Sequence, residues 1–337
     1  MRCNYVVKYF ISERSSKSFR VLAQIEVSMT DSLNAPKHGH LALTENDDEM
    51  AVMFNSASSR TPQVRFGLRA AELSMHAQGT STTYKATDMC HAPATTVSQL
   101  CFRDPGYMHK VIITSLKPDQ LYFYQYGNDQ DGWSKIHSFR SKPDSKTART
   151  AKFIAYGDMG VDGAPAAQST AARVFEDVVG NDYDSFLLHF GDISYARGKA
   201  HVWDKFFHLI EPYATRIPYM VSIGNHEYDY TSGGEHDPSG GAGPSGNGFH
   251  PTWGNFGSDS GGECSVPMKH RWHGETLDSF AEFPSPATGN SIYWYSFDYA
   301  GIHVVQMSTE HNWTRGSEQY EWLKRDLQSV DRSVTPW

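Results

Sequence analysis

The stretch KFIAYGDMG, residues 152–160, decides the fold that this chain is predicted to adopt. Its first five residues are mainly apolar, and the glycine that follows them predicts a buried strand that stops at a tight turn. Asp158 would then lie at the carboxyl edge of a sheet, where open α/β folds place their sites. Taken alone the pattern is weak, because aspartates that only form turns are common after strands.

Two later stretches repeat this pattern. The run FLLHF (186–190) is followed by GDISY, and the run YMVSI (219–223) is followed by GNHE. The intervals between the polar residues are 34 and 33 residues, enough for a helix and a return to the sheet. We therefore expect three strand ends to bring a set of polar side chains to one crevice. The set is Asp158, Asp192, Tyr195, Asn225 and His226. Oxygen ligands with an imidazole suit Fe, Mn or Zn.

The motifs G-D-x-G, G-D-x-x-Y and G-N-H-E, in this order and at this spacing, resemble those of the calcineurin-like metallophosphoesterases. The tyrosine of the second motif is typical of the purple acid phosphatases. Three longer stretches resemble the large plant-type members: GDISYARG (191–198), DSGGEC (259–264) and STEH (308–311). The resemblance runs from about His40 to Trp337, and the motifs are specific as a set rather than singly.

The resemblance implies a dinuclear metal centre. Asp192 would bridge two metals, with Asp158 and Tyr195 on Fe(III) and with Asn225 on a divalent ion, Zn, Mn or Fe. His226 would contact the substrate phosphate or assist proton transfer to the leaving group. A metal-bound hydroxide would attack phosphorus. The expected function is that of an acid phosphatase that hydrolyses small phosphate monoesters or anhydrides.

The same resemblance also supports a second function. In the family a further strand with a histidine ligand and then a G-H-x-H motif are expected, and neither occurs before Trp337. We therefore expect the domain to be C-terminally incomplete, and each metal to lack part of its protein ligands. The alternative is a truncated, inactive fragment or pseudoenzyme that serves at most as a binding module, with little or no phosphatase activity.

Two domains are expected from the length and from the order of the predicted elements. Residues 40–141 contain short strand candidates at the spacing of a β-sandwich, and they resemble the fibronectin-III-like domain of plant purple acid phosphatases. Polar residues 141–150 predict a linker. Residues 151–337 would form the α/β metallophosphoesterase domain, with mixed β-sheets flanked by helices. Residues 1–39 resemble the tail of an upstream β-rich region.

Several elements are predicted inside these domains. Strands are expected at 4–10, 19–25, 50–54, 63–66, 109–113, 121–126, 136–139, 291–297 and 302–307. Helices are expected at 164–179, 202–210 and 318–329, where apolar residues recur at helical spacing. The glycine-rich residues 231–262 predict a long surface loop at the border of the crevice.

Charge and composition exclude some partners. The net charge is −8, and no basic stripe of a nucleic-acid binder is visible. No apolar run approaches the ~18 residues that would suggest a membrane span. The residues from Met1 to Ile11 lack the features of a signal peptide, although the resembled family is usually secreted. NWT (312–314) is a glycosylation sequon if the chain is secreted. Localisation and oligomeric state stay open.

Several other side chains could act in a site or be purely structural. The four cysteines form no C-x-x-C pair; Cys90 and Cys101 could form a disulfide, and free thiols are about equally expected. Glu227 is equally expected to support the metal ligands or to have a purely structural role. Five further histidines are expected to be structural: His189, His201, His208, His303 and His311.

Overall fold

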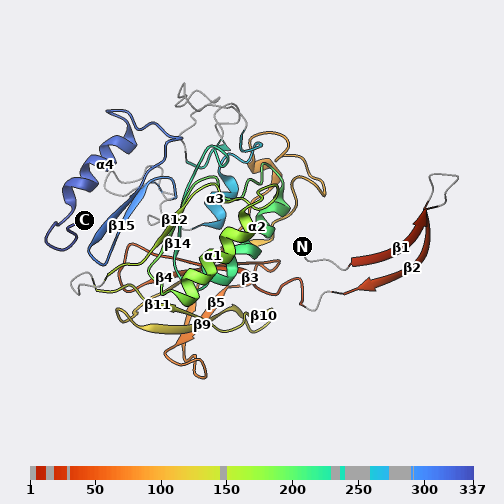
Figure 1. The fold of residues 1–337 in the computed structure, drawn as a ribbon, viewed down its shortest axis with the longest axis horizontal. Helices are drawn as coiled ribbons and strands as arrows, with labels where there is room; N and C mark the ends of the chain where they lie inside the picture. The colour runs from red at the N-terminus through yellow and green to blue at the C-terminus, as the bar shows by residue number, and fades with distance from the viewer. Residues whose placement is uncertain are drawn as a thin grey trace.

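The computed structural model describes residues 5–12, 19–28, 31–144, 150–228, 236–239, 259–272, 290 and 292–337. Figure 1 shows a body of packed sheets and helices from which one two-stranded ribbon projects. This ribbon consists of β1 (Tyr5–Ser12) and β2 (Phe19–Val27), which pair antiparallel as the sequence predicted. None of the helices formed by the described residues has the length and hydropathy that a bilayer crossing requires.

A three-stranded parallel sheet carries the motif residues. Its strands are β12 (Ile154–Tyr156), β13 (Leu187–Phe190) and β14 (Tyr219–Ser222), in that order. Because the strands are parallel and in register, all three end at the same edge of the sheet. The predicted arrangement of three strands, each followed by a glycine and a polar residue, is therefore present.

The two faces of this sheet have different neighbours. Leu187 and Val221 pack on one face against α1 (Ala167–Gly180) and α2 (Ala200–Ala214), the two crossover helices. Leu188, on the opposite face, belongs to a different apolar cluster. Side chains alternate between the faces of a strand, so a continuous apolar run is what a sheet buried on both sides requires.

Helices α1 and α2 agree with the predicted ones in place but not in length. Helix α1 begins at Ala167 rather than at 164, because the chain still forms a turn at residues 165–166. Helix α2 runs from Ala200 to Ala214 and includes Pro212. It buries one stripe at helical spacing: Val202, Trp203, Phe206, Phe207 and Ile210.

The C-terminal part forms a hairpin and a helix. Strands β15 (Tyr295–Tyr299) and β16 (Ile302–Gln306) pair antiparallel, and α4 (Glu318–Ser329) begins where the sequence predicted. The strand predicted at 291–297 starts too early, because Ile292 and Tyr293 form a turn; Ser291 lies outside the described residues. His303 joins this hairpin to α4, with contacts of 2.6 Å to Asp298 and 2.9 Å to Asp326.

The N-terminal domain contains two antiparallel sheets. One has the order β3-β4-β8-β7 and the other β10-β9-β5-β6, with β11 paired to β9. The first sheet is formed by β3 (Lys37–Ala42), β4 (Met50–Ser56), β8 (Tyr107–Ile113) and β7 (Thr80–Thr82). The second is formed by β10 (Gly132–Trp133), β9 (Leu121–Asn128), β5 (Gln63–Gly67), β6 (Met75–Gln78) and β11 (His137–Arg140). All five strands predicted in this domain are present.

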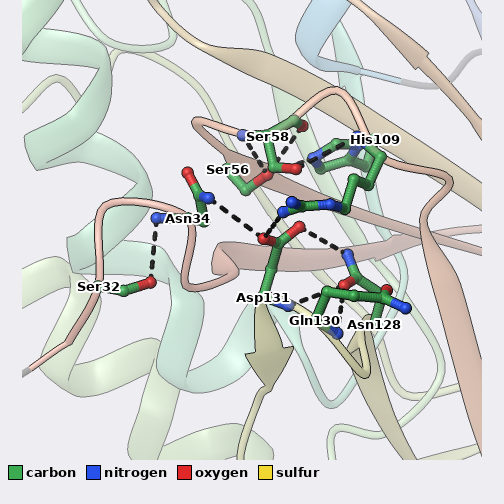
Figure 2. A network of polar contacts seen from close by, with 9 residues as sticks. Ser32, Asn34, Ser56, Ser58, His109, Asn128, Gln130 and Asp131 are labelled. Carbon is green, nitrogen blue, oxygen red and sulfur yellow. Dashed lines mark hydrogen bonds and ion pairs between the residues drawn. The ribbon is translucent and has the colours of Figure 1, made fainter.

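One polar network ties loops of the N-terminal domain together. Asp131, in the turn between β9 and β10, accepts hydrogen bonds from Asn34 at 3.2 Å and Asn128 at 3.0 Å (Figure 2). It also pairs with Arg60. Burial raises the pKa of Asp131, but hydrogen bonds from Ser58 and Asn128 and the charge of Arg60 lower it overall. A buried carboxylate at this position is therefore well supplied with donors.

The two domains share a core. The apolar cluster on the second face of the parallel sheet contains Val52 and Tyr124 of the sandwich together with Phe186, Met220 and Phe297. Tyr124 also donates a hydrogen bond of 2.8 Å to the carbonyl of Thr215. The sandwich therefore packs directly on the sheet that carries the motifs.

A disulfide joins the domains as well. It connects Cys90 with Cys264, across 174 positions of sequence. The Cys90–Cys101 pairing considered from the sequence is not formed, and Cys101 is a free thiol. The reason is tertiary: the backbone amide of Cys90 donates to the carbonyl of Gly262 at 2.9 Å, which brings the two loops together.

Candidate metal centre

The motif residues lie just beyond the strand ends in strained backbone. Asp158, Asp192 and Tyr195 have φ angles of 57°, 51° and 56°, a left-handed conformation that residues other than glycine rarely adopt. Arg197 follows with a φ angle of 50°. Such strain is uncommon and gathers at functional sites, where the surrounding fold maintains it.

Tyr195 brings the two aspartates together. Its Oη lies 2.6 Å from Oδ1 of Asp158 and 3.0 Å from Oδ2 of Asp192. A phenol carries a single proton, so the two carboxylates compete for one donor. Burial, the hydrogen bond to Asp158 and the charge of Asp192 raise the pKa of Tyr195 far above its usual value. Burial also raises the pKa of Asp192, and the neighbouring Asp158 adds to this rise.

His226 is in contact with the same group. Its backbone amide donates to Oδ1 of Asp192 at 3.1 Å, and its Nε2 lies 3.9 Å from the other oxygen of that carboxylate. The imidazole ring lies 4.5 Å from the ring of Tyr195, between centroids. The structure therefore places His226 beside Asp192 and Tyr195.

Asn225 contacts a residue that sequence reasoning did not assign. Its Nδ2 donates to Oδ2 of Asp259 at 2.7 Å. Asp259 opens the DSGGEC stretch, which was noted only as typical of the resembled family. The rest of the predicted crevice loop, residues 231–235 and 240–258, lies outside the described residues.

Glu227 supports the site through the backbone. Its carboxylate is buried and accepts hydrogen bonds from the amides of Asp192 at 2.7 Å, Ile193 at 2.8 Å and Gly224 at 3.1 Å. Burial and the charge of Asp192 raise its pKa to about 8, although the three amides oppose this rise. Glu227 thus fastens the turn after β13 to the turn after β14.

A cavity of about 770 Å³ opens beside Asp158 and Tyr195. Arg197 and Lys199 line it, and the guanidinium of Arg197 lies 5.3 Å from the centre of the Tyr195 ring. This volume is within the usual range of ligand pockets. His201, expected to be structural, also lines the cavity. The beginning of α1 and the exposed Leu100 of the N-terminal domain complete the wall.

The chemistry of these donors suits cations. Two carboxylates and a phenol lie within hydrogen-bond distance and share too few protons. A positive ion between them would relieve the repulsion that, after burial, adds to the raised pKa values of Asp192 and Tyr195. Within the part of the chain that the structure describes, no three His, Cys, Asp or Glu side chains form a metal cluster by themselves. Any metal held here would therefore need the phenol and amide oxygens as well as the carboxylates.

Two of the histidines expected to be structural, His189 and His311, have partners inside the fold. Nδ1 of the buried His189 lies 2.7 Å from the hydroxyl of Tyr219 in the neighbouring strand β14. His311 is buried between the hydroxyls of Ser308 at 2.8 Å and Ser239 at 2.6 Å. Both ring nitrogens of His311 are therefore occupied, and Nδ1 of His189 is held by Tyr219, as expected for structural histidines.

Two family models match the chain. The one described as purple acid phosphatase, N-terminal domain, matches residues 36–141. The one described as calcineurin-like phosphoesterase matches residues 151–337, more than half of the chain.

Individual relatives are also phosphatases or phosphodiesterases by name. The chain is 37% identical over 319 residues to "Probable inactive purple acid phosphatase 9" of Arabidopsis thaliana, covering 90% of this chain and 46% of the relative. It is 32% identical over 215 residues to "Nucleotide pyrophosphatase/phosphodiesterase" of Hordeum vulgare, covering 61% of this chain and 50% of the relative. A solved purple acid phosphatase from yellow lupin seeds matches with a TM-score of 0.77 at 30% identity, covering 100% of this chain and 55% of that one. The chain spans about half the length of these curated relatives.

Proposed function

The chain belongs to the calcineurin-like phosphoesterases and, within them, to the plant-type purple acid phosphatases, and we propose that it carries the site of an acid phosphatase. The substrates are small phosphate monoesters or anhydrides, hydrolysed at a centre of two metals. The observation that supports this proposal most is the position of the Tyr195 hydroxyl between the carboxylates of Asp158 and Asp192.

Each motif residue has a proposed role at the metals. Asp192 would contact both ions. Asp158 and Tyr195 would hold Fe(III), and Asn225 would hold a divalent ion, Zn, Mn or Fe. When bound, the metals act as Lewis acids and stabilise negative charge on the phosphoryl oxygens. Binding would also displace the Tyr195 proton that the two carboxylates now share.

The substrate would lie over the same residues. His226 is placed beside Asp192 and would contact the phosphate. Arg197, whose guanidinium nitrogen lies 3.4 Å from Nε2 of His226, would add a positive charge on the side of the cavity. Arg197 and Lys199 line the cavity with no carboxylate partner among the described residues, whereas Lys205 pairs with Asp162 at 2.7 Å. We assign the cavity to the leaving group, because it continues directly from Asp158 and Tyr195.

A second function is favoured by the names of similar proteins. Several relatives with 32–37% identity are called probable inactive purple acid phosphatases. A chain of this kind would retain the fold and bind metal or phosphate without turnover. It would then act as a binding module.

One experiment distinguishes these functions. The chain is loaded with Fe(III) and Zn(II), and its metal content and hydrolysis of p-nitrophenyl phosphate are measured beside Asp192→Asn. An acid phosphatase should bind about two metals per chain and turn the substrate over, and the variant should lose both properties. Metal binding without hydrolysis would favour the binding module. A wild-type chain that binds neither metal nor inorganic phosphate would contradict both.

A further inference from the structure

We propose that Asp259 is a positioning residue that sets the orientation of the Asn225 amide at the metal centre. The inference rests on the proposed function, because it assigns Asn225 to a metal. It concerns a residue that belongs neither to the G-D nor to the G-N-H-E motifs. Asp259 lies 34 positions beyond Asn225 in sequence, and the two side chains meet at the edge of the site.

The first argument concerns the two ends of the Asn225 amide. A metal takes the carbonyl oxygen of an asparagine, whereas the NH₂ group can only donate. An unconstrained side chain can turn either end toward the site. The carboxylate of Asp259 accepts from Nδ2 at 2.7 Å, and a carboxylate accepts only from the NH₂ end. Asp259 therefore selects the rotamer that leaves the oxygen of Asn225 for the metal.

The second argument concerns His226. Nδ1 of its ring lies 3.0 Å from the backbone carbonyl of Asp259, and Nε2 lies 3.4 Å from the guanidinium of Arg197. A carbonyl can only accept and a guanidinium can only donate. The hydrogen bond to this carbonyl therefore uses the Nδ1–H of the ring, and Nε2 faces the guanidinium of Arg197. The backbone and the side chain of one residue thus orient two neighbouring groups of the site.

The third argument is that Asp259 sits on a well-anchored loop. The amide of Cys264 donates to Oγ of Ser260 at 3.2 Å, and Cys264 is linked to Cys90 in the N-terminal domain. The carbonyl of Gly261 accepts from the amide of Ala94 at 3.1 Å. Gly261 has a φ angle of 63°, and a Cβ there would lie 2.4 Å from the backbone of Arg197. These contacts fix the place from which Asp259 reaches Asn225.

Two substitutions separate orientation from fold. Asp259→Asn keeps an oxygen that can accept from Asn225, whereas Asp259→Leu, of similar size, offers none. Both leave the backbone carbonyl that contacts His226. The His226 tautomer, read from its ring ¹⁵N shifts, therefore reports whether the loop has stayed in place. Asp298→Leu is the matched control, because it removes a carboxylate that contacts a histidine in the hairpin β15–β16.

The test has a metal-free and a metal-bound measurement. Without metal, the side-chain NH₂ signal of ¹⁵N-labelled Asn225, assigned through Asn225→Gln, should show slow proton exchange in the wild type and Asp259→Asn and fast exchange in Asp259→Leu. With Fe(III) present, calorimetry should show a 10- to 100-fold loss of Zn(II) affinity in Asp259→Leu, about the effect of removing a group that orients a ligand. Asp259→Asn and Asp298→Leu should stay within about threefold of the wild type.

The outcomes are distinct. If wild-type chain binds Zn(II) and Asp259→Leu binds it equally well, with an unchanged His226 tautomer, the role of Asp259 is overturned and the metal centre stands. Equal losses in both Asp259 variants would overturn it too, because they would make the charge of Asp259 responsible rather than the orientation. A wild-type chain that binds no Zn(II) overturns the metal centre and, with it, this role.

Discussion

The hydroxyl of Tyr195 lies 2.6 Å from Oδ1 of Asp158, although the two residues are 37 positions apart in sequence. One crossover helix and one strand separate them along the chain, and the parallel sheet brings their turns to the same edge. The pair depends on left-handed backbone at both residues. The fold therefore maintains a costly local conformation in order to bring a phenol against two carboxylates.

Glu227 should contribute to stability through its three backbone partners. Glu227→Gln keeps the shape but replaces one acceptor oxygen by a donor that faces amide N–H groups. We expect a loss of about 1–3 kcal/mol in the free energy of unfolding, the usual effect of leaving a buried donor unsatisfied. Urea unfolding measures it. A variant as stable as the wild type would show that the turns after β13 and β14 do not need this carboxylate.

The disulfide between the domains should be a major source of stability. It closes a loop of 174 positions, and constraining the unfolded chain in this way typically contributes about 2–5 kcal/mol. We expect Cys90→Ser to lower the free energy of unfolding by that amount, and Cys101→Ser, which removes a free thiol, to change it little. Denaturant titrations under non-reducing conditions test this. Equal stabilities of the two variants would contradict it.

His303 should make stability depend on pH. Burial lowers its pKa, but the hydrogen bonds and charges of Asp326 and Asp298 outweigh burial and raise it above 6.5. A raised pKa means that the folded state holds the proton more tightly than the unfolded state. The stabilisation is therefore complete below pH 6.5 and is lost as the pH rises through the folded-state pKa.

The measurement compares the wild type with His303→Gln in urea across this pH range. The variant cannot be charged, so its deficit should be largest in acid and should shrink in alkali. A deficit that is constant with pH would mean that the contacts of His303 act through packing alone.

Arg197 should bind phosphate in the metal-loaded chain. A charged hydrogen bond to an anion contributes about 1.5–3 kcal/mol, so Arg197→Ala should weaken the binding of inorganic phosphate roughly 10- to 100-fold. Lys205→Ala is the control, since the ammonium of Lys205 is already paired with Asp162. Calorimetric titration gives both affinities. If the two variants bind phosphate alike, Arg197 does not face the anion.

Much of the site could be predicted because its residues follow short apolar strands. A buried parallel strand and the glycine after it are local features, and their repetition indicated which edge of the sheet would gather Asp158, Asp192 and Asn225. The helix at 318–329 could be predicted from its apolar spacing; the structure adds a cap, in which the side chain of Ser317 accepts from the amide of Tyr320 at 3.2 Å.

Other features depend on contacts between distant segments. Nothing near Cys90 indicates that Cys264 would be its partner, because the pairing follows from the docking of two loops. Asp259 could not be placed for the same reason. Strand β3 was also missed, since its sequence KHGHLA has a glycine between two histidines rather than an apolar alternation.

The most direct test of the central claim is the visible spectrum of the Fe(III)-loaded chain and of its Tyr195→Phe variant. A phenolate bound to Fe(III) gives a charge-transfer band, and phenylalanine cannot provide one. We predict a coloured wild type and a variant that still binds iron but has lost the band. A variant that keeps the band, or a wild type that binds iron without colour, would contradict the assignment of Tyr195 to the metal.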